Sequence, residues 1–353
     1  MSWLWSRARR ALLSGGALGW LVVAMLLAQL GANSALAQRR AGARAAGRPT
    51  AKAANATKSD TSKPNLAPKA DDATTAEAGD AKAKDIGQDW VRMKYDAAGE
   101  PLAMQTAVVR YTGTPAGGKK PVEVDLIGAV HIADAGYYDK LNERFKQYDV
   151  LLYELVAPEG TVVERGRGTS NMHPIGAMQN MAKDVLELDH QLEDIDYTKP
   201  NFVHADMSPE DFQKAMAERN DSFLQMYFRL IGQAMAQQSE MAAKGQSSDF
   251  DLISALFATD RARRIKIVLG KQLSDMESLM ISFGGDDGSA IITDRNKKAL
   301  EVLKQQIAEG KKKIGIFYGA GHLADMDKRL RSDFNLQPES ITWLTAWDLA
   351  AKK

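Results

Sequence analysis

The sequence predicts an α/β fold, with two pseudo-symmetric β-rich halves that form a mixed or parallel sheet and a helical middle insertion. Two short apolar runs, residues 122–127 and 313–318, each predict a buried strand. Helical periodicity follows the first run and precedes the second, so strands and helices alternate, as in folds with parallel strands. Between the two runs, apolar residues recur at helical spacing, which predicts the helical insertion.

Related motifs follow the two apolar runs. Residues 128–134 read Gly-Ala-Val-His-Ile-Ala-Asp, and residues 319–325 read Gly-Ala-Gly-His-Leu-Ala-Asp. The glycine permits a sharp turn, and the aspartate suits the first turn of a following helix. Because ligands bind at the carboxyl ends of strands in open α/β sheets, we expect His131 and His322 to share one site. The alternatives are chance identity of short motifs and histidines that are only structural.

The amino-terminal region predicts export. Residues 1–37 contain Arg7, Arg9 and Arg10, an apolar core at 17–30 and a small-x-small signature at 35–37, as in a signal peptide. An uncleaved anchor is the alternative. Residues 38–87 have almost no large apolar side chains and predict a disordered low-complexity tether to a folded domain at 88–353. We expect a periplasmic or secreted protein, tethered to the envelope or free, with no stable membrane span after signal cleavage.

Within residues 88–353, apolar periodicity places the remaining elements. The patterns predict strands at 90–95 and 104–111 around a turn at 96–99, a strand at 150–156, a short strand at 201–206 and a last strand at 341–347. They predict helices at 137–148, with Tyr138, Leu141 and Phe145 on one face, at 176–188, from Ser208-Pro209 onward, and at 294–308 before Gly310. Two helical stripes fill the middle: Phe223, Met226, Tyr227, Leu230 and Ile231, then Ile265, Val268, Met276, Leu279, Met280 and Phe283.

Composition limits the chemistry of the site. The chain has 353 residues, a net charge of +1 and no cysteine. The lack of cysteine excludes disulfides, thiol nucleophiles and thiolate metal sites, so any metal must be held by histidine, carboxylate, backbone carbonyl or water. The balanced charge gives no support for a nucleic-acid partner.

Glu154 is the next candidate, because it lies inside the apolar run 150–156. A carboxylate is costly to bury unless it is paired or binds a metal. Its strand is expected beside the His131 strand in a βαβ unit. His131, Glu154 and His322 then form a two-histidine, one-carboxylate set, which suits a divalent metal such as Mn, Zn, Co or Fe. Without a metal, one histidine can take a proton from water while Glu154 orients it. A position in solvent just past the strand end is the alternative for Glu154.

Further polar residues stand near the expected site. Arg295 and Asn296 begin the helix before the second motif, where an arginine can clamp a carboxylate or stabilise an oxyanion. A solvated arginine is the alternative reading. Asp206 ends a short strand on the same edge, or belongs only to the following helix start. Substrate contacts are assigned to Gly128, Gly319, Asp206 and Asn296.

Together these residues resemble the TraB/PrgY/GumN and Tiki superfamily, whose relatives include erythromycin-esterase-like and ChaN-like haem-binding proteins. The resemblance covers about residues 88–350. It implies an α/β core of two similar halves and, from Tiki proteins, metal-dependent proteolysis. The matching positions are Gly128 and His131 for the first motif, Glu154 for the acid, Arg295 for the arginine, and Gly319 and His322 for the second motif. The first motif departs from the family pattern, because Ala129 and Val130 stand where a polar residue often precedes the histidine.

We therefore expect an exported metal-dependent hydrolase, a peptidase or amidase acting on a peptide or small-molecule substrate. His131, Glu154 and His322 are expected to bind the metal and activate water, and Arg295 to steady the substrate or transition state. One rival is a non-catalytic haem- or metal-binding envelope protein that uses the same histidines. Another is an envelope interaction module in which the site is vestigial.

Overall fold

The computed structural model describes residues 86, 89–115, 120–158, 160–161, 186–219, 255, 258–283 and 289–351. The predicted signal peptide, the predicted tether apart from residue 86, almost all of the predicted helix at 176–188 and the first middle stripe lie outside these residues. Within the described residues, no helix is both long enough and apolar enough to cross a membrane.

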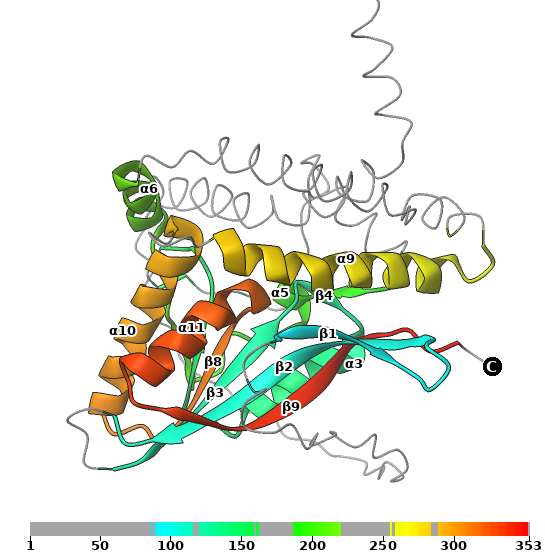
Figure 1. Ribbon diagram of the computed structural model, residues 1–353. Helices are drawn as coiled ribbons and strands as arrows, with labels where there is room; N and C mark the ends of the chain where they lie inside the picture. Colours follow the sequence, from blue (N-terminus) through cyan, green and yellow to red (C-terminus); the bar gives the residue numbers. More distant parts are fainter. Residues whose placement is uncertain are drawn as a thin grey trace, which may run out of the picture.

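The described chain is an α/β fold built on a seven-stranded mixed sheet, as the sequence predicts (Figure 1). Six strands follow the order β1-β2-β3-β8-β5-β7, and β9 pairs with β2. The strands are β1 (Val91–Tyr95), β2 (Pro101–Gly113), β3 (Val122–Ala129), β5 (Val150–Tyr153), β7 (Phe202–His204), β8 (Lys313–Gly319) and β9 (Gln337–Asp348).

The antiparallel part of the sheet is organised by the long strand β2. β1 pairs with the first half of β2 and β3 with its second half, while β9 pairs along nearly its whole length. Since a strand has two hydrogen-bonding edges, β1 and β3 share one edge and β9 occupies the other. The predicted turn after β1 is confirmed: Asp96 Oδ1 accepts from the backbone N–H of Ala98 and Glu100, and Gly99 has a φ of +84°.

The other half of the sheet is parallel. β8 pairs with β3 on one side and with β5 on the other, and β5 pairs with β7. The expectation that the strand of Glu154 lies beside the strand of His131 is therefore wrong, because β8 lies between β3 and β5. A crossover connection fixes the direction of two strands but does not require them to be neighbours.

Helices cover both faces of the parallel part (Figure 1). Phe317 on β8 contacts Phe145 of α3 (Ala135–Phe145), with ring centroids 4.9 Å apart. The next residue, Tyr318, contacts His322 of α11 (Ala320–Ser332), at 5.3 Å. Because successive side chains of a strand point to opposite faces, α3 and α11 lie on opposite faces. Both faces are covered, which explains why the parallel strands are apolar on both sides.

The remaining elements surround this core. α10 (Arg295–Ala308) contacts β5 and α11, and α9 (Arg261–Phe283) contacts β1 and α11. A five-residue π-helical turn, η1 (Ala290–Asp294), leads directly into α10. α6 (Pro209–Glu218) begins as predicted, with Ser208 as its N-cap accepting from the Asp211 N–H. A small second sheet pairs β4 (Ile132–Ala133) with β6 (Asp189–His190), and the short helix α5 (Gln191–Asp194) follows.

Candidate functional site

Charged and polar side chains from four elements meet at the carboxyl edge of the parallel strands. Glu154 follows β5 directly, and Asp206 lies two residues after β7. Arg295 and Asn296 begin α10, and His322 lies in the first turn of α11. This edge is where ligands bind in open α/β sheets. Both alternatives that placed a site residue in water are wrong, because the side chains of Glu154 and Arg295 are only 9% and 4% exposed.

Glu154 uses both carboxylate oxygens. Oε2 accepts from the backbone N–H of Gly319 at 2.6 Å, and Oε1 accepts from Arg295 Nη2 at 2.7 Å. A Cβ atom at Gly319 would lie 3.2 Å from Oε2, so this position favours glycine for close approach. Burial opposes ionisation, but Arg295, the two histidines and the Gly319 N–H outweigh it and lower the pKa of Glu154 to about 2. Glu154 is therefore a carboxylate at neutral pH.

Asp206 holds Arg295 in place. Arg295 Nε donates to Oδ1 at 2.9 Å and Nη2 donates to Oδ2 at 2.5 Å, so the Asp206 carboxylate binds the guanidinium through two hydrogen bonds. Burial alone lowers the pKa of Arg295, but the two carboxylates raise it above its usual value, and the group stays charged. Nη2 is occupied by Glu154 and Asp206. Nη1 is the guanidinium nitrogen that faces His322, at 3.4 Å from Nε2.

His322 is oriented by Asn296. Asn296 Nδ2 donates to the His322 carbonyl at 2.9 Å and to Asp325 Oδ2 at 2.8 Å, which leaves its Oδ1 facing the ring. His322 Nδ1 lies 2.7 Å from that oxygen, so Nδ1 carries the proton and donates. Burial lowers the pKa of His322 to about 4, although Glu154 opposes this. The ring is neutral at pH 7, and its unprotonated Nε2 lies 3.4 Å from Arg295 Nη1 and 3.5 Å from Glu154 Oε1.

The charges of the site do not cancel. Glu154 and Asp206 are two buried carboxylates, and both pair with the same guanidinium of Arg295. With His322 neutral, the group has one excess negative charge. Arg295, the two histidines and the Gly319 N–H stabilise the Glu154 carboxylate, as its lowered pKa shows, but the net charge of the group remains negative. The site therefore favours a cation or a developing positive charge next to Glu154.

Four backbone carbonyls in and beside the loop of His131 accept hydrogen bonds. The Tyr137 and Tyr138 hydroxyls of α3 donate to the carbonyls of residues 128 and 130. The Gln191 backbone N–H donates to the carbonyl of residue 131, and the Trp347 indole of β9 donates to that of residue 132. The side chain is partly exposed. Burial lowers the pKa of His131, whereas Glu154 raises it and Arg295 lowers it further. His131 is thus within electrostatic reach of the site, while His322 contacts both Glu154 and Arg295.

The two matching motifs form different local structures. In the first motif Ile132 and Ala133 form the short strand β4, and α3 begins only at Ala135, with Asp134 at its N-cap as predicted. In the second motif α11 begins at Ala320, directly after Gly319, so His322 is inside the helix and Asp325 lies one turn further along. The expectation that Asp325 marks the helix start is wrong. It instead accepts from Asn296, the residue that orients His322.

The predicted metal set can be tested against these positions. His322 Nε2 and Glu154 Oε1 are 3.5 Å apart, which an ion bound at ~2.1 Å to each can bridge. Among the described residues, however, no group of three or more His, Asp or Glu side chains is arranged to hold a metal ion. Arg295 Nη2 also donates to the same Oε1. As arranged, the three predicted ligands do not fit a metal ion, and no step below depends on one.

Other assigned residues have packing roles. A Cβ atom at Gly128 would meet the Ala107 carbonyl at 3.2 Å and Leu323 at 3.4 Å, so this glycine lets α11 approach the sheet. Tyr318 packs its ring on His322 and donates to the Ala205 carbonyl, which lies next to Asp206. Sequence reasoning placed Asp325 at a helix start rather than in the site, and it gave no role to Gln191. Both residues reach the site only through tertiary contacts, which no local pattern shows.

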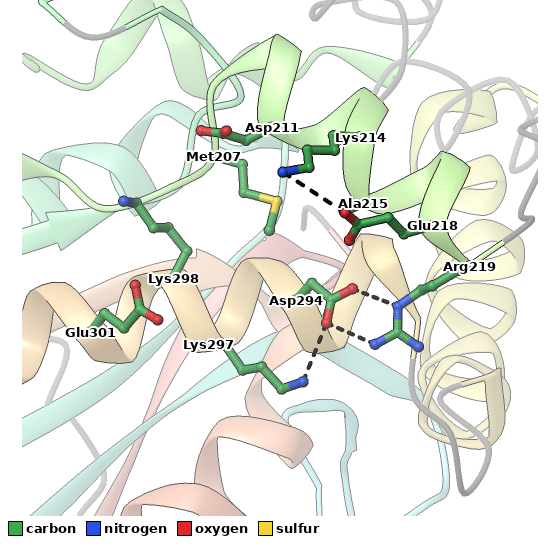
Figure 2. A pocket seen from close by; sticks show the side chains of 10 residues that line it. All are labelled: Met207, Asp211, Lys214, Ala215, Glu218, Arg219, Asp294, Lys297, Lys298 and Glu301. Carbon is green, nitrogen blue, oxygen red and sulfur yellow. Dashed lines mark hydrogen bonds and ion pairs between the residues drawn. The ribbon is translucent and has the colours of Figure 1, made fainter.

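A groove of about 550 Å³ lies between α6 and α10, beside the buried site (Figure 2). Four acidic and four basic side chains line it, and Arg219 bridges to Asp294 through two hydrogen bonds of 2.5 and 2.7 Å. The lining includes Met207 and Asp294, which adjoin Asp206 and Arg295 in the chain, but neither Asp206 nor Arg295 itself. Two residues of the groove lining are thus chain neighbours of site residues.

Comparisons with models of known protein families, with curated proteins and with solved structures found no match for this chain.

Proposed function

We propose that the protein is a hydrolase of peptide or amide bonds, with its reaction centre at His322, Glu154 and Arg295. One observation carries this proposal. His322 is a buried, neutral imidazole, oriented through Nδ1 by Asn296, and the contacts of its Nε2 with the described residues are long, 3.4 Å to Arg295 and 3.5 Å to Glu154. Its lone pair is therefore not engaged in a strong hydrogen bond inside the protein.

In the proposed reaction, His322 Nε2 takes a proton from water, and the oxygen attacks the carbonyl carbon of the substrate. A ring with a pKa of about 4 is a weak base in isolation. The adjacent Glu154 carboxylate and the excess negative charge of the site stabilise the imidazolium as it forms. The imidazolium then gives the proton to the leaving amine, so that the base is regenerated.

Arg295 stabilises the oxyanion in this scheme. Nε donates to Asp206, and Nη2 donates to both Asp206 and Glu154. Among the described residues, the contact of Nη1 is the long one to His322. Nη1 can therefore donate to the oxygen that becomes negative in the transition state. Asp206 fixes the guanidinium plane, which keeps Nη1 in one position.

Binding of a cation without catalysis is the second candidate. The excess negative charge favours it, and Glu154 and His322 would hold the ion. Kinship with the TraB/PrgY/GumN and Tiki superfamily and export remain part of the proposal, and metal dependence is the alternative that metal analysis tests.

The test uses the purified full chain with casein and a mixed peptide library, and mass spectrometry detects cleavage. We expect His322→Ala to lower turnover by about 10²–10⁴-fold, the usual effect of losing a general base. His131→Ala is measured beside it. Asp125→Asn is the matched control, because it changes another buried polar residue outside the site.

Metal content is measured in the same samples, before and after chelation, and Mn, Zn, Co and Fe are added back singly. Turnover in chelated protein supports hydrolysis by the protein groups alone. Recovery with one metal supports the metal dependence that the resemblance implies. Cleavage that is the same in wild type and His322→Ala would contradict the proposed enzyme, and metal bound without turnover would favour the second candidate.

A further inference from the structure

Gln191 lies directly opposite His131. β4 and β6 pair antiparallel, with Ile132 opposite His190. Extending that register by one residue places Gln191 opposite His131, and the Gln191 N–H donates to the His131 carbonyl at 2.9 Å. Residues directly opposite each other in antiparallel chains have their side chains on the same face, close enough to interact. The Gln191 carboxamide is therefore beside the His131 imidazole.

One atom of that carboxamide lacks a hydrogen-bond partner. Gln191 is buried, and its Nε2 donates to the Tyr197 hydroxyl at 2.8 Å, while no donor among the described residues is in hydrogen-bonding geometry with its buried Oε1. An unsatisfied buried oxygen costs ~1–3 kcal/mol and needs an explanation. The nearby donor is the imidazole, and the Gln191 side chain raises the pKa of His131 against the larger lowering by burial. An acceptor has this effect on an imidazole.

His322 has the same kind of partner, a carboxamide oxygen, and there the hydrogen bond is formed. His322 donates from Nδ1 to the carboxamide oxygen of Asn296, whose Nδ2 is fixed by two other acceptors. In both Gln191 and Asn296, the amide nitrogen donates to another group, and the amide oxygen remains to accept from the histidine. The two carboxamides come from unrelated parts of the sequence.

We infer that Gln191 is the positioning residue for His131: its Oε1 accepts the ring N–H, which fixes one tautomer and leaves the other ring nitrogen unprotonated for the site. This rests on the proposed function in one respect, that His131 takes part in the reaction. The positioning itself is a separate claim. Tyr197 completes the arrangement, because it holds the amide so that the oxygen faces the ring.

The experiment uses the full chain with ¹⁵N-labelled histidine, after chelation of metals. The chain has only five histidines, so long-range ¹H–¹⁵N spectra resolve each ring, and His131→Ala identifies its signals. In wild type we expect a single His131 tautomer. Gln191→Leu removes the acceptor at similar size and is expected to give a mixture of tautomers. Gln191→Glu keeps an acceptor and is expected to retain one tautomer, with the ring N–H proton shifted downfield.

Gln272→Leu is the matched control. Gln272 on α9 is also buried with an unpartnered Oε1, but it is not among the groups that act on His131. We expect it to leave the His131 signals unchanged. An unchanged His131 tautomer in folded Gln191→Leu would overturn the inference. If Gln191→Leu does not fold, Gln191→Glu decides, because an unchanged chemical shift of the His131 ring N–H proton in that variant would also overturn it.

Turnover gives a second readout that separates the two proposals. We expect Gln191→Leu to lower kcat by about 10-fold with KM nearly unchanged, since residues that orient a reacting group typically cost 10–100-fold. Gln191→Glu is expected to recover part of that loss. A changed tautomer in a protein that hydrolyses nothing would sustain the positioning role and remove the proposed function.

Discussion

The sheet contains two buried ionic clusters, and they differ in charge balance. Asp125 on β3 is 1% exposed and binds two arginines, Arg110 and Arg144, which are 30% and 22% exposed. The Tyr148 hydroxyl also donates to it, at 2.6 Å. At the other cluster, Glu154 and Asp206 share the single Arg295. The first has cations in excess around its carboxylate, and the second has carboxylates in excess around its cation.

This difference separates structural from reactive groups. Asp125 has its hydrogen bonds filled from several directions, and its arginines reach solvent, so nothing is left to bind a ligand. The Glu154 cluster is almost entirely buried, has excess negative charge and faces an unprotonated imidazole nitrogen. Strongly perturbed groups in such settings mark functional sites more often than structural ones.

Removing Arg295 is expected to have the largest effect. Arg295→Met leaves Glu154 and Asp206 buried without a cation, which should lower the free energy of unfolding by about 3–5 kcal/mol. Chemical denaturation measures this. Adding Glu154→Gln and Asp206→Asn to Arg295→Met should recover most of the loss, because no charge is then left unpaired. A loss of stability below ~1 kcal/mol for Arg295→Met would show that water reaches the two carboxylates and solvates them.

Glu154→Gln and Asp125→Asn sharpen the contrast directly. Glu154→Gln removes a carboxylate that the folded protein stabilises, as its lowered pKa shows, so the free energy of unfolding should fall. Turnover should also fall, by about 100–1000-fold, or ~3–4 kcal/mol in activation free energy. Asp125→Asn should lower stability by about 3 kcal/mol and leave kcat within a few fold. Denaturation curves and peptide hydrolysis are measured on both. Equal losses of turnover would show that the two clusters have the same role.

The sequence predicts much of this arrangement, because local chemistry marks it. Apolar runs give β3 and β8, and an acid inside an apolar run gives Glu154. Strand order is not local, so the position of β8 between β3 and β5 could not be derived. The same holds for Gln191, which reaches His131 only through the pairing of β4 with β6, and for the π-helical turn that precedes Arg295.

Acid should weaken the Glu154 cluster in two stages. Burial lowers the folded pKa of His322 to about 4, below its usual ~6.5, so between these values only the unfolded chain binds the proton. Stability therefore falls as pH drops from 6.5 to 4, by on the order of 3 kcal/mol. Glu154, with a folded pKa of about 2, contributes stability present above its unfolded value near 4.3 and lost as pH falls toward 2.

Denaturation of the chelated protein as a function of pH measures both stages. His322→Asn removes one of two rings with a lowered pKa and should reduce the first stage to the part that His131 contributes, while Asp125→Asn should leave the first stage intact. A first stage that survives undiminished in His322→Asn would assign it to another group.

A smaller effect is expected at Gly319. Gly319→Ala places a Cβ atom 3.2 Å from Glu154 Oε2, so the carboxylate must shift, and we expect about 10-fold lower turnover. The matched control is Gly136→Ala on α3, where a Cβ atom meets nothing within 4 Å. That change should raise the free energy of unfolding by up to ~1 kcal/mol, since alanine favours helix, and should leave turnover unchanged. Equal turnover in the two variants would show that Glu154 tolerates displacement.

The protonation state of His322 tests the central claim most directly. In ¹⁵N-histidine spectra of the full chain, recorded from pH 3 to 8 after chelation and assigned with His322→Ala, we expect a ring that is neutral at pH 7, protonated on Nδ1, with an apparent pKa of about 4. Glu154→Gln should lower that pKa further, because Glu154 stabilises the charged ring. A His322 ring that is charged at pH 7, or protonated on Nε2, would contradict the proposed base, because Nε2 would then have no lone pair to take a proton from water.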